Sequence, residues 1–241
     1  MKLKTLALEL YRPLRAIALT GDRFYCPLCE GRFRAFLPIG VVARPNARCP
    51  WCDSLERHRL LWVALQQLWQ DGKIRRGGKL MHVAPEASLA RRFRQDFDYL
   101  SVDISSDTKA MQVMDIRRIP LPDQTFDAIA CHHVLEHIPE DAQALSELYR
   151  VLKPGGWASI QVPMAGDVTQ EDLSITDPAV RQRLYGQPDH VRQYGRDFQQ
   201  RLEAAGFQVQ IYSKQAICTD ESLERLSVEC ETEVWICLKN R

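Results

Sequence analysis

Long apolar runs are absent from this sequence of 241 residues. No stretch approaches the roughly 20 consecutive apolar residues that a membrane-spanning helix needs. The leucine-rich first 11 residues include Glu9, which argues against a signal peptide. Internal repeats and low-complexity tracts are missing as well. Because 45% of the residues are hydrophobic, we expect a globular, cytoplasmic protein with a buried core.

Net charge is also small, at +1, but the charges are unevenly distributed. Residues 1–60 contain 11 Lys or Arg and 5 Asp or Glu, a balance of +6, whereas residues 61–241 contain 21 and 26, a balance of −5. A basic amino-terminal segment favours contact with nucleic acid, although an ordinary solvated basic face has the same composition. Both interpretations of this segment remain open.

The eight cysteines fall into two groups. Cys26 and Cys29 form one Cys-X-X-Cys pair, and Cys49 and Cys52 form a second pair after 19 intervening residues. Two such pairs predict a closed, structural zinc site made of four thiolates. A redox dithiol needs only one pair, and disulfides are disfavoured in a reducing cytosol. The remaining cysteines lie in apolar or strand-like settings and are expected to be buried: Cys131, Cys218, Cys230 and Cys237.

The segment around the two cysteine pairs spans about 45 residues, which is too few to bury a core without help. We therefore expect metal binding to supply its folding free energy. Asp53 and Glu56 have the N-cap and N3 spacing of a capping box, and apolar residues repeat at helical spacing from Leu61 to Trp69. A further amphipathic helix is predicted over residues 3–17. Residues 1–72 are thus expected to hold an N-terminal helix, a zinc module and a connecting helix.

Strand-like and helix-like patterns alternate in the rest of the chain. Asp103 and Asp115 each follow a short apolar run, which suggests two strands that end beside a polar ligand. A helix over residues 140–152 is predicted with Pro139 at its first position, and residues 153–156 should end it. The alternation implies right-handed crossovers and a doubly wound α/β sheet. The predicted strands span residues 80–84, 99–102, 111–114, 126–131, 157–162, 207–212 and 233–238, and the last helix spans residues 196–205.

Three linked motifs carry a family resemblance: LPDQTFD at residues 121–127, HVLEH at residues 133–137 and ELYRVLKPGG at residues 147–156. In this order they resemble the class I S-adenosylmethionine-dependent methyltransferases, and within that class the group called methyltransferase type 11. The resemblance implies a Rossmann-like, mostly parallel seven-stranded sheet with an antiparallel last strand. It implies methyl transfer from S-adenosylmethionine by a domain spanning residues 73–241.

The resemblance also assigns parts of a cofactor site. It implies that Asp103 accepts hydrogen bonds from the ribose hydroxyls, and that Asp115 and Ile116 hold the adenine. His132 and His133 follow the fourth strand, where the cofactor methyl should face its acceptor. We single out His133 as the catalytic residue, because an imidazole can remove a proton near neutral pH. A purely lining role for His133 stays open.

The first loop departs from the family pattern, because it lacks the usual glycines. Residues 82–88 read HVAPEAS. Ala84 is small enough for close approach, Pro85 can pre-set the turn, and Glu86 can meet the amino group of the methionine portion. The alternative is a noncatalytic zinc-ribbon interaction or nucleic-acid-binding protein that uses a degenerate methyltransferase fold as a scaffold.

The acceptor is the least determined feature. The zinc module before this fold is similar in arrangement to ribosomal-RNA guanine methyltransferases, so RNA and a small molecule both remain open as acceptors. Residues 163–188 are polar and are a candidate lid over the sheet edge. The connector over residues 189–195 is rich in polar and aromatic groups, and its His190 either contacts substrate or is structural.

Overall fold

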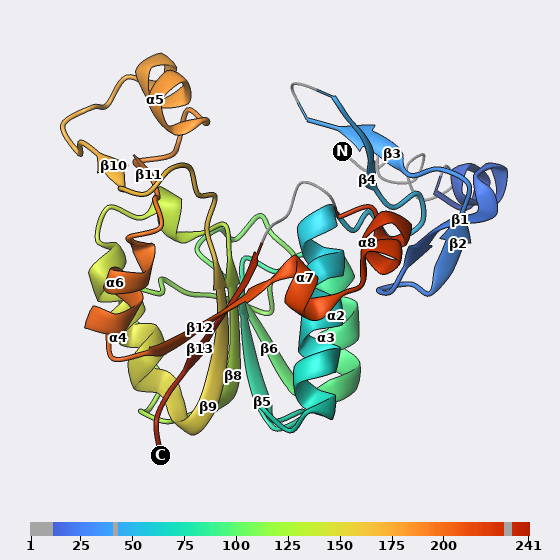
Figure 1. Ribbon diagram of the computed structural model, residues 1–241. Helices are drawn as coiled ribbons and strands as arrows, with labels where there is room; N and C mark the ends of the chain where they lie inside the picture. The colour runs from blue at the N-terminus through green and yellow to red at the C-terminus, as the bar shows by residue number, and fades with distance from the viewer. Residues whose placement is uncertain (1–11, 41–42, 229–232) are drawn as a thin grey trace. The chain divides into compact units, whose positions relative to one another are not determined.

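The computed structural model describes residues 12–40, 43–228 and 233–241 (Figure 1). The chain divides into two compact units. The cysteine unit comprises Met1–Lys73, Glu86–Arg92 and Tyr212–Val234, and the sheet unit comprises Ile74–Pro85, Phe93–Ile211 and Trp235–Arg241. No helix among the described residues is long and apolar enough to cross a membrane.

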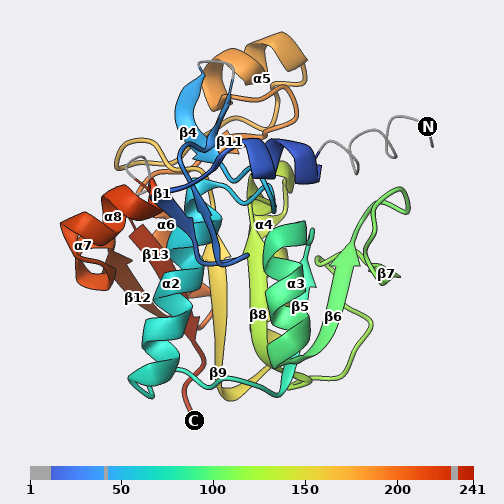
Figure 2. The same ribbon diagram turned by 90° about the vertical axis from the view of Figure 1, so that its right-hand side faces the viewer.

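The seven-stranded sheet has the strand order β12-β13-β9-β8-β5-β6-β7. Neighbours from β9 to β7 are parallel, whereas β13 runs antiparallel to β9. Figure 2 shows β8, β5 and β6 side by side. The predicted fold class is therefore confirmed. The strands are β5 (Lys79–Val83), β6 (Asp98–Asp103), β7 (Gln112–Val113), β8 (Phe126–His132), β9 (Leu152–Gln161), β12 (Gln208–Ser213) and β13 (Glu233–Leu238).

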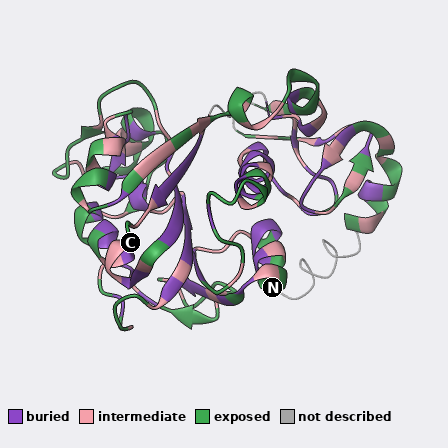
Figure 3. Cartoon of the chain, turned by 60° about the horizontal axis from the view of Figure 1, so that its bottom comes forward, coloured by how far each residue is buried: buried purple, intermediate pink, exposed green. Residues whose placement is uncertain are grey.

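Burial explains why the central strands read as continuous apolar runs. Most of β8 is buried, as expected for a parallel strand that is covered on both faces. Figure 3 shows buried residues concentrated on the strands of the sheet. The helix α4 (Asp141–Val151) places Leu145 and Leu148 on one face, and both are fully buried in the same core cluster as β8. The helix α6 (Phe198–Ala204) adds Phe198 and Leu202 to this cluster.

Two predictions around α4 were wrong. Glu140 is the N-cap of this helix, so Pro139 precedes the helix instead of occupying its first position. The carbonyl oxygen of Pro139 accepts a hydrogen bond from Arg192, at 2.8 Å, which holds it outside the helix. At the other end α4 does stop just before residues 153–156, but the strand predicted to begin at residue 157 begins earlier, because β9 starts at Leu152 and pairs there with Phe126.

The polar segment after β9 contains more regular structure than its sequence suggests. The short strand β10 (Gln170–Glu171) pairs with β11 (Arg192–Gln193), and the helix α5 (Pro178–Tyr185) lies between them in sequence. Asp177 caps α5, since its carboxylate accepts hydrogen bonds from the first backbone N–H groups of the helix. A 3₁₀ turn, η1 (Leu135–His137), follows β8. The helix α3 (Ala87–Asp96) connects β5 to β6.

The cysteine unit is built from two small hairpins and several helices. The hairpins pair β1 (Thr20–Cys26) with β2 (Gly31–Phe33) and β3 (Leu37–Ile39) with β4 (Arg44–Arg48). The helix α2 (Glu56–Gln70) follows the second cysteine pair, while α7 (Lys214–Ile217) and α8 (Asp220–Leu226) were not predicted. Residues 12–18 are helical, and the remainder of the helix predicted over residues 3–17 lies outside the described residues.

The predicted capping box of α2 was wrong. Leu55 is the N-cap, and its N–H donates to Nδ1 of His58 at 3.2 Å. Asp53 instead binds Arg12 and Arg15, while Glu56 accepts from Arg44 at 2.8 Å. The two acidic residues had the correct spacing for a cap, but nearby arginines compete for them as stronger, charged partners.

Candidate functional site

A cavity of about 440 Å³ opens at the carboxyl ends of β5, β6 and β8. In this sheet β6 lies on one side of β5 and β8 lies on the other, so the cavity marks the point where the strand order reverses. Open α/β sheets bind ligands at this position. The lining residues are Val83, Ala84, Asp103, Ile104, Met114, Asp115, Ile116, Arg117, His133, Val134, His137, Ile138 and Pro139. The volume is typical of sites for small molecules.

Two of the lining residues have a left-handed backbone. Ala84 has φ = 46° and His133 has φ = 53°, a conformation that residues with a side chain rarely adopt. The N–H of Ala84 donates to Val102 at 2.8 Å, and the N–H of His133 donates to Gln161 at 2.9 Å. Each strained turn is therefore fixed by a neighbouring strand. Strain of this kind concentrates at binding and active sites.

The two strand-end carboxylates differ in their surroundings. One oxygen of Asp103 accepts from the N–H of Ser105 at 3.0 Å. Asp115 is held by the guanidinium of Arg117, with Oδ2 at 2.7 Å from Nη2. The hydrogen bonds from Arg117 lower the pKa of Asp115 below its ordinary value. Asp103 is therefore the carboxylate with more capacity to accept hydrogen bonds from a ligand.

Five of the eight predicted cofactor-binding and catalytic residues line the cavity, and the other three do not. Those that line the cavity are Ala84, Asp103, Asp115, Ile116 and His133. His132 is 4% exposed and is not among the lining residues, since its Nε2 lies 3.1 Å from the Ser159 hydroxyl. Pro85 follows Ala84 without lining the cavity. Glu86 belongs to the cysteine unit, where its carboxylate lies 3.6 Å from Nε2 of His58.

Sequence reasoning missed several apolar lining residues. Ile104 is 67% exposed although it is large and apolar, and it directly follows Asp103. Val134 follows His133 in the same way after β8. An apolar residue one or two positions beyond the carboxyl end of a strand was the signal that could have identified both, because such a residue lies outside the buried part of the sheet.

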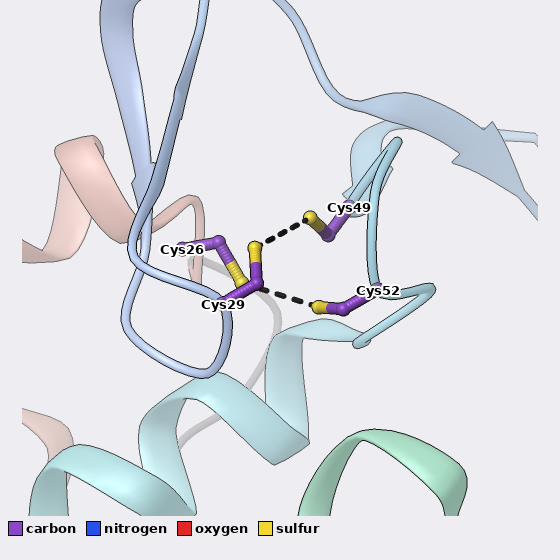
Figure 4. Close-up of side chains that lie close together, drawn as sticks. All are labelled: Cys26, Cys29, Cys49 and Cys52. Atoms are coloured by element: carbon purple, nitrogen blue, oxygen red, sulfur yellow. Dashed lines mark hydrogen bonds between the residues drawn. The ribbon is translucent and has the colours of Figure 1, made fainter. Parts of the chain in front are cut away.

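The four paired cysteines converge on one centre, as Figure 4 shows. The sulfur of Cys26 lies 3.5 Å from that of Cys52, and the sulfur of Cys29 lies 3.7 Å from that of Cys49. A tetrahedral zinc site with bonds of about 2.3 Å separates its sulfurs by about 3.8 Å, so these distances fit a zinc tetrathiolate. Hydrogen bonding, first of all from Cys29, lowers the pKa of Cys26.

Buried polar groups surround the cysteine cluster. The Ser54 hydroxyl lies 3.1 Å from the sulfur of Cys26 and 3.2 Å from that of Cys52. Arg59 is fully buried and donates to the carbonyl oxygens of Ser54, at 2.9 Å, and Leu226, at 2.6 Å. It therefore joins the cysteine turns to α8 within the same unit. Of the other cysteines, Cys131 and Cys237 are buried, Cys218 is half-buried, and Cys230 lies outside the described residues.

Comparison with known proteins finds a family that resembles part of the sheet unit. A family model described as a methyltransferase domain matches residues 74–160. Residues 74–160 therefore resemble a methyltransferase domain. The match covers all three motifs of the sequence resemblance and the strands whose ends line the cavity. The predicted class I methyltransferase resemblance is thereby confirmed for this domain.

Curated relatives resemble only part of this chain. The ubiquinone/menaquinone biosynthesis C-methyltransferase UbiE of Geobacter sulfurreducens is 27% identical over 129 residues, which cover 43% of this chain and 50% of the relative. A methyltransferase of Schizosaccharomyces pombe, C1B3.06c, is 50% identical over 42 residues, which cover 17% of this chain and 15% of the relative. The chain thus spans half or less of the length of these relatives.

Solved structures share the fold of the methyltransferase domain. The YcgJ protein of Bacillus subtilis superposes with a TM-score of 0.52 at 18% identity, covering 76% of this chain and 99% of that chain. The [4+2]-cyclase SpnF superposes with a TM-score of 0.50 at 15% identity, covering 78% and 84%. Because one neighbour is a cyclase, the fold alone does not determine the reaction, and the function must be argued from the site.

Proposed function

We propose that this chain binds S-adenosylmethionine in the 440 Å³ cavity and transfers its methyl group to an acceptor. The observation that carries this proposal is the position of Asp103, at the end of β6 and at the reversal point of a methyltransferase sheet. A carboxylate at that position accepts both ribose hydroxyls in dinucleotide-binding folds. The surrounding residues fit the group, since apolar side chains suit a base and the carboxylate suits a ribose.

The proposed cofactor contacts divide between side chains and backbone. Ile104 and Ile116 would pack against the adenine. The carboxylate of Asp115 is already paired with Arg117, so we assign the exocyclic amine to the backbone beside Ile116. Ala84 and Pro85 would let the chain approach the methionine portion closely. The predicted contacts of Glu86 and His132 with the cofactor stay predictions.

The chemistry asks little of the protein beyond binding and alignment. S-adenosylmethionine carries an electrophilic methyl group on a sulfonium, and the sulfur is the leaving group when that methyl is transferred. The protein must hold the acceptor in line with that methyl and exclude water. We propose that His133 accepts the acceptor proton, because it follows β8 and lines the cavity. Its Nδ1 lies 3.4 Å from Oε1 of Glu136, which would stabilise the imidazolium that forms.

The cysteine cluster is proposed to hold one structural zinc ion through Cys26, Cys29, Cys49 and Cys52. Four thiols at these distances form a closed shell with no position for substrate, so this metal would support folding. We propose that residues 1–72 carry this zinc module and that residues 73–241 carry the methyltransferase activity. RNA and a small molecule both remain proposals for the acceptor.

Cofactor binding tests the proposed function. Isothermal titration calorimetry should show S-adenosylmethionine binding to the wild-type chain. Asp103→Ala should weaken it by about 1–3 kcal/mol, the usual cost of deleting a charged hydrogen-bond partner. The matched control is Asp98→Ala, which removes an exposed carboxylate from the other end of β6 and should leave the affinity unchanged. No measurable affinity of the wild type would refute the proposal and favour a noncatalytic scaffold.

A further inference from the structure

Three side chains that could ligate a metal ion converge beside the cofactor cavity, and neither the comparisons nor the proposed function assigns a metal to them. They are Glu136 and His137, on the turn η1, and His190, from the connector before β11. One ligand atom of each lies within 4.8 Å of the others. His137 also lines the cavity, so the cluster lies at its edge.

Two atoms of this cluster are buried without a protein partner. Glu136 is 1% exposed and His190 is 3% exposed. Over the described part of the chain, Oε2 of Glu136 and Nε2 of His190 have no hydrogen-bond partner. A buried polar atom left unsatisfied costs about 1–3 kcal/mol. Two of them in one cluster therefore indicate a shared ligand, either an ion or a water molecule.

The tautomer of His190 favours a metal ion. Its Nδ1 lies 2.9 Å from the carbonyl oxygen of Tyr185. A carbonyl oxygen only accepts hydrogen bonds, so Nδ1 carries the proton, and in the neutral imidazole Nε2 then presents a lone pair. Metal-binding histidines are typically oriented by a carbonyl or carboxylate in this way. Asp189 Oδ2, 3.2 Å from Nδ1 of His137, would orient the second imidazole similarly.

The backbone around the cluster is rigidly held. Arg192 is 1% exposed, and it donates to the carbonyl oxygens of Leu135 at 3.1 Å and Pro139 at 2.8 Å. The N–H of Val191 donates to the carbonyl oxygen of Glu136 at 2.9 Å. These bonds fix the connector that carries His190 onto the turn that carries Glu136 and His137. The ligand atoms are thus preorganised before any ion binds.

We propose that Glu136, His137 and His190 bind a divalent transition-metal ion. One carboxylate and two imidazoles suit Mn²⁺, Fe²⁺ or Zn²⁺ better than Mg²⁺, which prefers oxygen ligands. Three protein ligands leave coordination positions open, unlike the closed shell of the four cysteines. The two metal sites of this chain therefore differ in ligand chemistry and in function.

The open positions define the acceptor class, a step that rests on the proposed methyl transfer. A hydroxyl oxygen of the acceptor would bind the ion, which lowers the hydroxyl pKa and favours loss of its proton to His133 or to solvent. The oxygen lone pair then forms the bond to the methyl carbon. The bond from sulfur to that carbon breaks, and its electron pair converts the sulfonium to a neutral thioether. The site thus selects a hydroxyl-bearing acceptor.

Mn²⁺ tests the site directly, because this hard ion disfavours the soft thiolates of the cysteine cluster. In a titration of the full chain followed by electron paramagnetic resonance, the wild type should bind about one Mn²⁺. Glu136→Gln and His190→Gln should each weaken binding at least about tenfold, since each removes one of three ligands. Glu140→Gln is the matched control, because this carboxylate lies on the following turn and pairs with Arg117.

The outcomes separate the metal site from the proposed function. A wild type that takes up no Mn²⁺, and no Co²⁺ or Zn²⁺ beyond the cysteine site, would overturn the proposal and leave a buried water as the shared ligand. Unchanged affinity in both ligand variants would overturn it too. If Glu136→Gln does not fold, two other measurements test the metal site. They are the Mn²⁺ affinity of His190→Gln and the melting temperature of the wild type, which Mn²⁺ should raise. Calorimetry with S-adenosylmethionine reports independently on the methyltransferase activity.

Discussion

Ala84 shows how a single residue can take the place of a glycine. Its φ of 46° belongs to a region that costs a residue with a Cβ about 1–2 kcal/mol. The hydrogen bond from its N–H to Val102, at 2.8 Å, holds it there. The absence of a glycine-rich loop therefore does not remove the sharp turn at the end of β5. The chain retains the turn at the cost of local strain.

Replacing Ala84 with glycine should relieve this strain. We expect Ala84→Gly to raise the free energy of unfolding by up to about 1 kcal/mol. Glycine removes the backbone strain of the folded state, and this gain exceeds the stabilisation of the unfolded chain by its added conformational entropy. Chemical denaturation measures the change. Ala84→Val is the opposing control, because a β-branched residue is an outlier at this φ and should destabilise the protein. A clear loss of stability in Ala84→Gly would contradict the left-handed turn.

At the scale of elements, a carboxylate on α4 organises the loop that precedes β8. Glu147 accepts from the N–H of Ile119 at 2.7 Å and from Nε of Arg150 at 2.7 Å. Arg150 in turn donates to the carbonyl oxygen of Leu121 at 2.9 Å. The hydrogen bond from Arg150 is the main cause that lowers the pKa of Glu147 below its ordinary value. A loop with little regular structure is thus held by two side chains of one helix.

This network predicts a pH-dependent stability. Folding lowers the pKa of the Glu147 carboxyl, so its charge stabilises the protein fully at pH values above the pKa of this group in the unfolded chain, about 4.5. This stabilisation is lost as the pH falls through the pKa of the group in the folded protein. Glu147→Gln should therefore cost about 1–2 kcal/mol at pH 7 and much less at pH 3. Urea denaturation at both pH values measures it. An equal loss at pH 3 and pH 7 would mean that the charge of Glu147 is not what matters.

At the scale of the whole molecule, several arginines of the cysteine unit pair with acidic groups of the same unit. Arg32 pairs with Asp22 at 2.7 Å, Arg44 with Glu56 at 2.8 Å, and Arg48 lies 3.9 Å from Asp53. These acidic groups are already subtracted in the balance of +6 for residues 1–60, so the pairs leave unchanged the net positive charge that suggested nucleic-acid contact. Exposed pairs of this kind contribute little to stability.

The cysteine unit should depend on metal, whereas the sheet unit has its own core. We expect the purified chain to contain about one zinc ion in a thiolate site. Cys26→Ser should lose this zinc and unfold the cysteine unit, leaving the central strands protected from hydrogen exchange. Elemental analysis and hydrogen-exchange mass spectrometry measure the two effects. Cys237→Ser is the control, since this buried cysteine lies in β13, away from the cluster.

Zinc-free wild-type protein whose cysteine unit remains folded would contradict this dependence. Loss of protection over the central strands in Cys26→Ser would contradict the independence of the sheet core. The proposed boundary at residues 72 and 73 stays a prediction. The two compact units are not divided at that boundary alone, because Glu86–Arg92 and Tyr212–Val234 also belong to the cysteine unit.

The sequence by itself determined the features that depend on local patterns. The apolar run of β8, the amphipathic α4 and the strand-end Asp103 follow from the spacing of neighbouring residues, and they sufficed for the fold class. The two Cys-X-X-Cys pairs likewise set the four-thiol cluster, because each turn aims two sulfurs at one point.

Only the tertiary structure decided which partner each polar group has. Asp53 had the spacing of a helix cap yet binds arginines, and Asp115 is occupied by Arg117. His190 lies beside Glu136 because Arg192, two residues after His190, donates a hydrogen bond to the carbonyl oxygen of Leu135 in the turn after β8. Periodicity reports which face of an element is buried, but a hydrogen-bond partner is selected by packing between segments far apart in the chain. No local pattern in the sequence records that selection.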